Sequence, residues 1–126
     1  MNIVLITLQI IIALGIYNVW LVRSGRSTKY RGGAAKNIKE EFAVYGLPPW
    51  FTIVIGVVKV SLATLILIGV WIPALILPAT AILGFLMLGA ISMHIKVRDP
   101  FIKALPASLM ALLSIAIVVL AYFVVG

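Results

Sequence analysis

The 126-residue sequence has no cysteine, a single histidine and only three acidic residues. The absence of cysteine excludes disulfides, thiolate metal sites, iron–sulfur clusters and CxxC redox motifs within the chain. One histidine cannot by itself form a zinc site or a bis-histidine haem site. We therefore expect no metal and no evident cofactor, and any chemistry must come from a few polar side chains.

Apolar side chains are abundant: 64% of the residues are hydrophobic and 10% are charged, whereas soluble domains are roughly 45–50% apolar. Four apolar stretches have the length of about 20 residues that crosses a bilayer. Backbone polar groups must be satisfied inside lipid, so these stretches should be helices. The sequence predicts an all-α, transmembrane four-helix antiparallel bundle in one domain, residues 1–126, with spans at 3–22, 50–70, 74–95 and 106–125.

Nine of the ten basic residues lie in two segments between these spans. Because cytoplasmic loops collect Lys and Arg, we expect segments 23–41 and 96–103 in the cytoplasm and both termini outside the cell membrane. Anionic lipid headgroups are the nearest phosphates, which favours lipid contacts over nucleic acid. The expected headgroup contacts are Arg23, Arg26, Lys96, Arg98 and Lys103.

The first basic segment ends in a pattern typical of a short helix. Asn37 and Glu40 form an N-cap pair, and Gly46 with Pro48 supplies a stop. We expect an interfacial helix at residues 38–45. Two prolines mark helix boundaries: Pro73 is expected to begin the third helix, and Pro106 to begin or kink the fourth. An aromatic belt at the membrane boundaries is expected from Trp20, Trp50, Trp71 and Tyr122.

Lys59 is the one basic residue inside an apolar span, about nine positions from its start and so near mid-depth. An ionisable group there costs on the order of 2.5 to 3.5 kcal/mol and normally faces protein or water. Thr52, Gly56 and Ala63 share its helix face, which is predicted to turn inward. Two interpretations stay open: an anion-, carbonyl- or proton-handling group, or a structural ion-pair partner or snorkelling side chain.

If Lys59 is structural, its partner should be Glu40 or Glu41. Pairing with Glu41 requires the turn at residues 46–49 to fold back, and an interfacial role is the alternative for this carboxylate. His94 can do acid–base work or bind a ligand, or it can be an interfacial residue favoured by the helix dipole. The ligand-binding candidates are Lys59, His94, Glu41 and Asn18.

Several other residues inside the spans are expected to serve packing. Gln9, Asn18 and Ser92 should make hydrogen bonds between helices, the commonest role of neutral polar groups in membrane bundles. A stripe of small residues on the fourth span should allow close helix contact; it consists of Ala107, Ala111, Ser114, Val118 and Ala121.

Two stretches carry a family resemblance: FAVYGLPPW at residues 42–50, continuing into GVVK at 56–59 and GVWIP at 69–73, and MLGAISMHIKVRDPFIKALP at 87–106. Together they resemble the DoxX-like family of small membrane proteins, over roughly residues 3–120, with HIKVRDP as the most specific part. The resemblance implies a four-helix membrane bundle. The wider family includes subunits associated with thiosulfate:quinone oxidoreduction and partners of redox or oxidative-stress complexes, and relatives with similar folds act in receptor assembly. No catalytic residue set carries over.

Three functions follow as hypotheses. The first is an accessory subunit of a membrane redox or other complex, without stand-alone activity, that binds a quinone or lipid in the bundle and contacts a protein partner or a second copy. The second is a small-molecule transporter. Multidrug exporters of this length carry an acidic residue in the first span, where this chain has only Gln9 and Asn18 as polar candidates. A transporter of this kind would therefore handle an anion, at Lys59. The third is an enzyme acting on an apolar substrate through Lys59 and His94, whose different depths are the obstacle.

Overall fold

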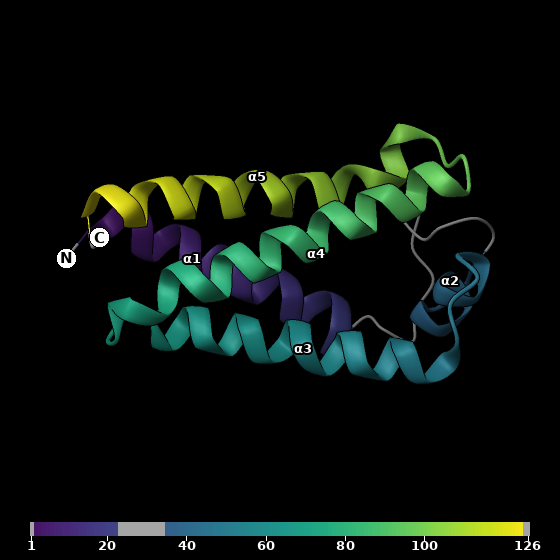
Figure 1. Ribbon diagram of the computed structural model, residues 1–126, viewed down its shortest axis with the longest axis horizontal. Helices are drawn as coiled ribbons and strands as arrows, with labels where there is room; N and C mark the ends of the chain where they lie inside the picture. Colours follow the sequence, from purple (N-terminus) through teal and green to yellow (C-terminus); the bar gives the residue numbers. More distant parts are fainter. Residues whose placement is uncertain (1, 23–34, 125–126) are drawn as a thin grey trace.

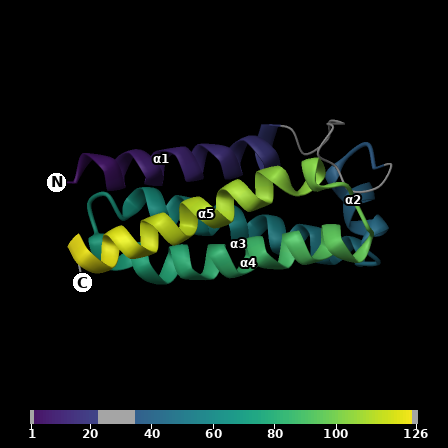
Figure 2. The same cartoon turned by 90° about the horizontal axis from the view of Figure 1, so that it is seen from above.

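The computed structural model describes residues 2–22 and 35–124. The described residues form four long helices and a short helix, α2. The long helices lie side by side, with both termini at one end and α2 at the other (Figures 1 and 2). We call these the terminal end and the α2 end. The elements are α1 (Ile3–Tyr17), the π-helical turn η1 (Asn18–Val22), α2 (Ile38–Val44), α3 (Pro49–Ile68), the 3-10 turn η2 (Pro73–Leu75), α4 (Ile76–Lys96) and α5 (Phe101–Val124).

Four helices of the described residues are long and apolar enough to cross a membrane: Ile3–Leu21, Pro49–Ile68, Pro73–Lys96 and Phe101–Val124. The predicted all-α membrane bundle is therefore confirmed, and each predicted span overlaps one of these helices. The fourth begins earlier than predicted, because α5 starts at Phe101 and contains Pro106 in its interior. The charge of Lys103 hides this start from the hydropathy pattern.

The four helices form a ring in which α1 contacts α3 and α5, and α4 contacts α3 and α5. Each helix contributes a fully buried side chain to the core: Ile12, Ile66, Leu83 and Ile117. The outer faces carry large exposed apolar side chains such as Phe85 and Phe123. Apolar patches of this extent require a partner or lipid, and the bilayer supplies it here.

The small-residue stripe on α5 packs as predicted. Ala111, Ser114 and Ala121 are buried. A Cβ atom added to Gly84 on α4 would lie 3.2 Å from the Cβ of Ser114, so the two backbones approach closely at this point. This contact fixes α4 against α5, which run side by side in both views (Figures 1 and 2).

The short helix α2 begins as its sequence predicts. Asn37 is the N-cap, and its side-chain oxygen accepts a hydrogen bond of 2.9 Å from the Glu40 amide. The Asn37 side-chain amide also donates to the Glu40 carboxylate at 2.6 Å. The first bond satisfies the Glu40 N–H, one of the open N–H groups of the first turn. The second holds the exposed Glu40 carboxylate against the cap residue.

Three of the four aromatic residues expected at the membrane boundaries are exposed: Trp50, Trp71 and Tyr122. Trp20 differs, because its ring meets Phe42 of α2 edge-on at 5.8 Å between centroids. It also occupies the space beside Gly56, where an added Cβ would lie 2.8 Å from the ring. The glycine on α3 therefore lets the indole reach into the bundle.

Candidate functional site

A tight turn after α2 folds this helix back onto the bundle. Gly46 has a positive φ of 82°, a conformation that glycine adopts without steric cost. The Leu47 amide donates to the Phe42 carbonyl and the Gly46 amide to the Ala43 carbonyl, both at 3.0 Å. These two bonds define a Schellman cap. The turn predicted at residues 46–49 does fold back, and it brings Glu41 over α3.

The end of α4 has the same Schellman cap, but arginine occupies the position where glycine is usual. Arg98 takes the left-handed position with φ of 58°. The Asp99 amide donates to the His94 carbonyl and the Arg98 amide to the Ile95 carbonyl, both at 3.0 Å. A residue with a Cβ pays about 1–2 kcal/mol in this conformation. The cap returns the chain so that the Asp99 side chain faces His94.

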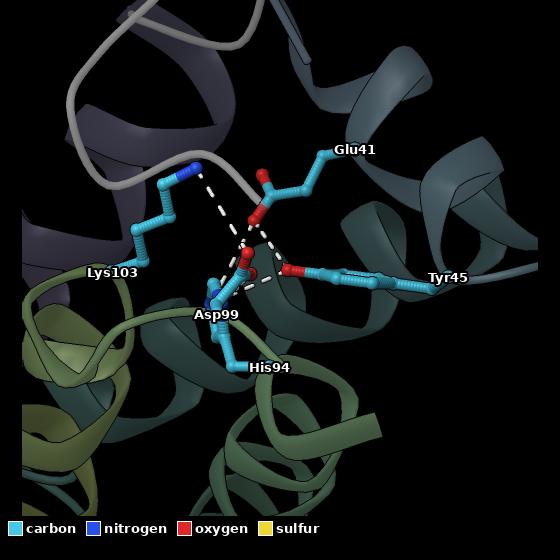
Figure 3. A network of polar contacts seen from close by, with 5 residues as sticks. All are labelled: Glu41, Tyr45, His94, Asp99 and Lys103. Atoms are coloured by element: carbon cyan, nitrogen blue, oxygen red, sulfur yellow. Dashed lines mark hydrogen bonds and ion pairs between the residues drawn. The ribbon is translucent and has the colours of Figure 1, made fainter. Parts of the chain in front are cut away.

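The two caps together assemble a polar cluster of five residues from α2, α4, the α4–α5 turn and α5 (Figure 3): Glu41, Tyr45, His94, Asp99 and Lys103. His94 lies at its centre and is 6% exposed. Its Nδ1 is 2.8 Å from Asp99 Oδ2, and its Nε2 is 3.3 Å from the Tyr45 hydroxyl and 3.9 Å from Glu41 Oε1. Lys103 Nζ lies 3.9 Å from Asp99 Oδ1.

The direction of the hydrogen bonds defines what the cluster can do. The Tyr45 hydroxyl donates to Glu41 Oε1 at 2.7 Å, so its oxygen is left to accept from His94 Nε2. The Asp99 carboxylate can accept a hydrogen bond from His94 Nδ1. Both ring nitrogens therefore face acceptors, and a doubly protonated imidazole can donate to both. The cluster can hold and pass on a proton.

Lys59 lies in the interior next to this cluster. It is 8% exposed, and its ammonium nitrogen is 5.4 Å from the centroid of the Trp20 ring, a cation–π contact. The Glu41 carboxylate acts on it by charge attraction. Thr52 and Ala63 are buried on the same face of α3, which confirms that this face turns inward.

The five basic residues expected at lipid headgroups fall into three groups. Lys96 Nζ donates to the Tyr45 carbonyl at 2.9 Å and so ties α4 to α2, and Lys103 reaches Asp99. Arg98 is exposed. Arg23 and Arg26 lie outside the described residues. Headgroup contact stays a prediction for all five.

The three neutral polar residues expected to bond between helices, Gln9, Ser92 and Asn18, have different surroundings. Gln9 makes the expected bond between helices, its Nε2 donating to the Ile66 carbonyl at 2.8 Å. For Ser92 the expectation is wrong, because its hydroxyl bonds the Leu88 carbonyl of its own helix. Asn18 is exposed on the π-helical turn, and the structure does not bring it into the polar cluster.

Sequence reasoning missed the roles of Tyr45 and Asp99. An aromatic residue in a short amphipathic helix is typical of its apolar face, but the spacing of four from Glu41 places the Tyr45 hydroxyl beside this carboxylate. An aspartate before proline is typical of a helix start, and this pattern does not indicate the contact of Asp99 with His94. The position of Asp99 five residues after His94 fits a Schellman cap, a pattern concealed because arginine occupies the place where glycine is usual.

Four spanning helices around a buried lysine, closed at one end by the polar cluster, define a multi-pass membrane protein of the four-helix bundle class. The family model of the DoxX-like family matches residues 8–121, so the chain belongs to the DoxX-like family. No curated protein and no solved structure matches the chain.

Proposed function

We propose that this chain is an accessory subunit of a membrane redox complex that receives a quinone beside Lys59 and exchanges protons with it through the polar cluster. The observation that carries the proposal is the chain of polar contacts from Asp99 through His94 and Tyr45 to Glu41. Its last member attracts the Lys59 ammonium. We infer that protons move along these contacts between Asp99 and Glu41, and that the charge of Glu41 couples this movement to Lys59.

Each step of this path is made of groups that transfer protons readily. The imidazole of His94 can take a proton at one nitrogen and release one at the other. The Tyr45 hydroxyl accepts from the ring and donates to Glu41. Because His94 and Tyr45 are buried, their hydrogen bonds are stronger than in water and their order is fixed.

The residues near Lys59 suit a carbonyl-bearing ring. Lys59 is a donor, and the Thr52 hydroxyl on the same inner face is buried without a partner among the described residues. Leaving such a group unsatisfied costs about 1–3 kcal/mol, which an acceptor on a ligand removes. Trp20 and Phe42 supply flat apolar surface. When bound, the quinone supplies the electron-accepting chemistry; the chain supplies donors, apolar walls and protons.

The accessory role follows from what the sequence offers for electron transfer. With no cysteine, the chain provides no thiol and no iron–sulfur centre of its own. In the proposed complex, electrons for a bound quinone would come from another subunit. The exposed apolar faces of the spans leave surface for such a subunit within the membrane.

The chain has three tryptophans, which allows a test by fluorescence. A variant that keeps only Trp20 (Trp50→Phe and Trp71→Phe) is titrated with decylubiquinone in lipid nanodiscs. We expect saturable quenching, because the ligand would sit against this ring. A variant that keeps only the exposed Trp71 at the other end is the matched control, and it should show only linear collisional quenching.

Lysine variants make the test specific. In the Trp20-only background, Lys59→Met should abolish the saturable phase, and Lys39→Met, at an exposed position on α2, should leave it intact. Linear quenching of Trp20, equal to that of Trp71, would contradict quinone binding. Isolation from native membranes in mild detergent without a stoichiometric redox partner would contradict the accessory role.

A further inference from the structure

We propose that the terminal end of the bundle carries a second binding site, which takes an uncharged amphiphile whose hydroxyl group donates a hydrogen bond to the Gln9 side-chain carbonyl. A pocket of about 280 Å³ opens between the start of α1, the α3–α4 connection and the end of α5. Its walls are apolar except for Asn2 and Gln9. The site is independent of the polar cluster at the other end.

The orientation of the Gln9 amide is fixed by the end of α3. The Val70 amide donates to the Leu67 carbonyl in a tightened last turn, which leaves the Ile66 carbonyl without its usual helical donor. Gln9 Nε2 fills this place at 2.8 Å. Turning the amide over would set two carbonyl oxygens against each other, so Nε2 must face Ile66 and Oε1 must face away.

Gly69 leaves the room that this arrangement needs. A Cβ atom at this position would lie 2.7 Å from Ile76 Cγ1, 3.0 Å from the Ile66 carbonyl oxygen and 3.4 Å from Gln9 Nε2. Gly69 also lines the pocket. The amide, the carbonyl and the pocket wall are thus packed together as one unit.

The remaining polar atom of the amide, Oε1, has no partner among the described residues. Gln9 is fully buried, and its Oε1 accepts no hydrogen bond from the described residues. A buried acceptor next to a pocket selects a ligand that donates. The other polar wall residue, Asn2, already uses its side-chain oxygen to cap α1. Because none of the described residues that line the pocket is charged, we expect a neutral ligand.

Gln9 is the only glutamine in the chain, so glutamine labelled with ¹³C and ¹⁵N reports on this one amide. The probes are 1-octanol and heptyl methyl ether, isomers of which only the alcohol can donate. We expect 1-octanol to shift the Gln9 side-chain carbonyl resonance saturably and to bind about fivefold to tenfold more tightly than the ether. Equal responses to the two isomers, or no response to either, would overturn the proposal.

Two matched variants show whether the response comes from this pocket. Val124→Trp places a large ring in the wall of the pocket at an exposed position, and should abolish the response to the alcohol. Val119→Trp makes the same change at another exposed position of α5, in the wall of a separate pocket lined by α4 and α5, and should leave the response unchanged. The same response in both variants would also count against the site.

Discussion

At the α2 end, five polar or charged side chains form a connected cluster, and one of them, Glu41, interacts by charge with a sixth residue, Lys59. At the terminal end, by contrast, the buried amide of Gln9 meets a single backbone carbonyl among the described residues. Both arrangements bury polar groups in an apolar bundle. The first does so by grouping charges of opposite sign, and the second by using the one carbonyl that a helix end leaves open. The charged side chains that contact one another thus lie at the α2 end.

The largest effect is expected from removing the centre of the polar cluster. His94→Leu would leave the buried Asp99 carboxylate without its imidazole and the Tyr45 hydroxyl without one of its contacts. We expect a loss of about 3 kcal/mol in the free energy of unfolding. The measurement is unfolding by SDS in mixed micelles. Ser92→Ala on the same helix, which removes a bond within an exposed turn, should change it by less than about 0.5 kcal/mol.

Replacing a closely packed glycine by alanine should lower the free energy of unfolding equally at the two ends of the bundle. Gly56→Ala and Gly69→Ala each place a Cβ within 3 Å of another side chain, and we expect each to cost about 2 kcal/mol. Gly89 on α4 has nothing within 4 Å among the described residues. Gly89→Ala should instead stabilise the protein by up to about 1 kcal/mol. The same unfolding assay measures all three, and similar values for them would contradict the packing described here.

A smaller effect is expected at the terminal end. Gln9→Leu removes the donor to the Ile66 carbonyl, and hydrogen bonds between membrane helices contribute about 1 kcal/mol. Asn18→Leu at an exposed position of the same span is the control and should be close to neutral. A cost for Gln9→Leu as large as that of His94→Leu would remove the contrast between the two ends.

The smallest effect concerns the two Schellman caps of the α2 end. Gly46 suits its left-handed conformation and Arg98 does not. Arg98→Gly removes the steric cost, partly offset by the greater freedom of glycine in the unfolded chain, and should stabilise by about 0.5 kcal/mol. Gly46→Ala should destabilise. The sign of each change in thermal unfolding checks the assignment, and a loss of stability in Arg98→Gly would show that its side chain has a role of its own.

The sequence predicts the spans well because each depends only on local composition. The four apolar stretches place every spanning helix, and the inward turn of Lys59 follows from Thr52 and Ala63 on its face. The error at the fourth span has a local cause too. The charge of Lys103 interrupts the apolar pattern of the sequence. In the structure Lys103 forms an ion pair with Asp99, and α5 is helical on both sides of it.

The polar cluster was only half predictable. Two of its five members, His94 and Glu41, are ligand-binding candidates on sequence alone because they are ionisable groups in or beside apolar spans. Their meeting depends on two chain reversals. The reversal at Gly46 is indicated by glycine and proline, whereas the reversal at Arg98 uses a residue that no local rule favours. The place of Asp99 beside His94 could therefore not be derived.

The most direct test of the link between Lys59 and the polar cluster is a double-mutant cycle with Lys59→Met and Glu41→Gln. Glutamine retains an acceptor for the Tyr45 hydroxyl, so this variant changes mainly the charge. If Glu41 attracts the buried ammonium, the free energies of unfolding should show a coupling of about 1 kcal/mol or more between the two changes. Additive effects, with a coupling below about 0.3 kcal/mol, would show that Lys59 is not joined to the cluster.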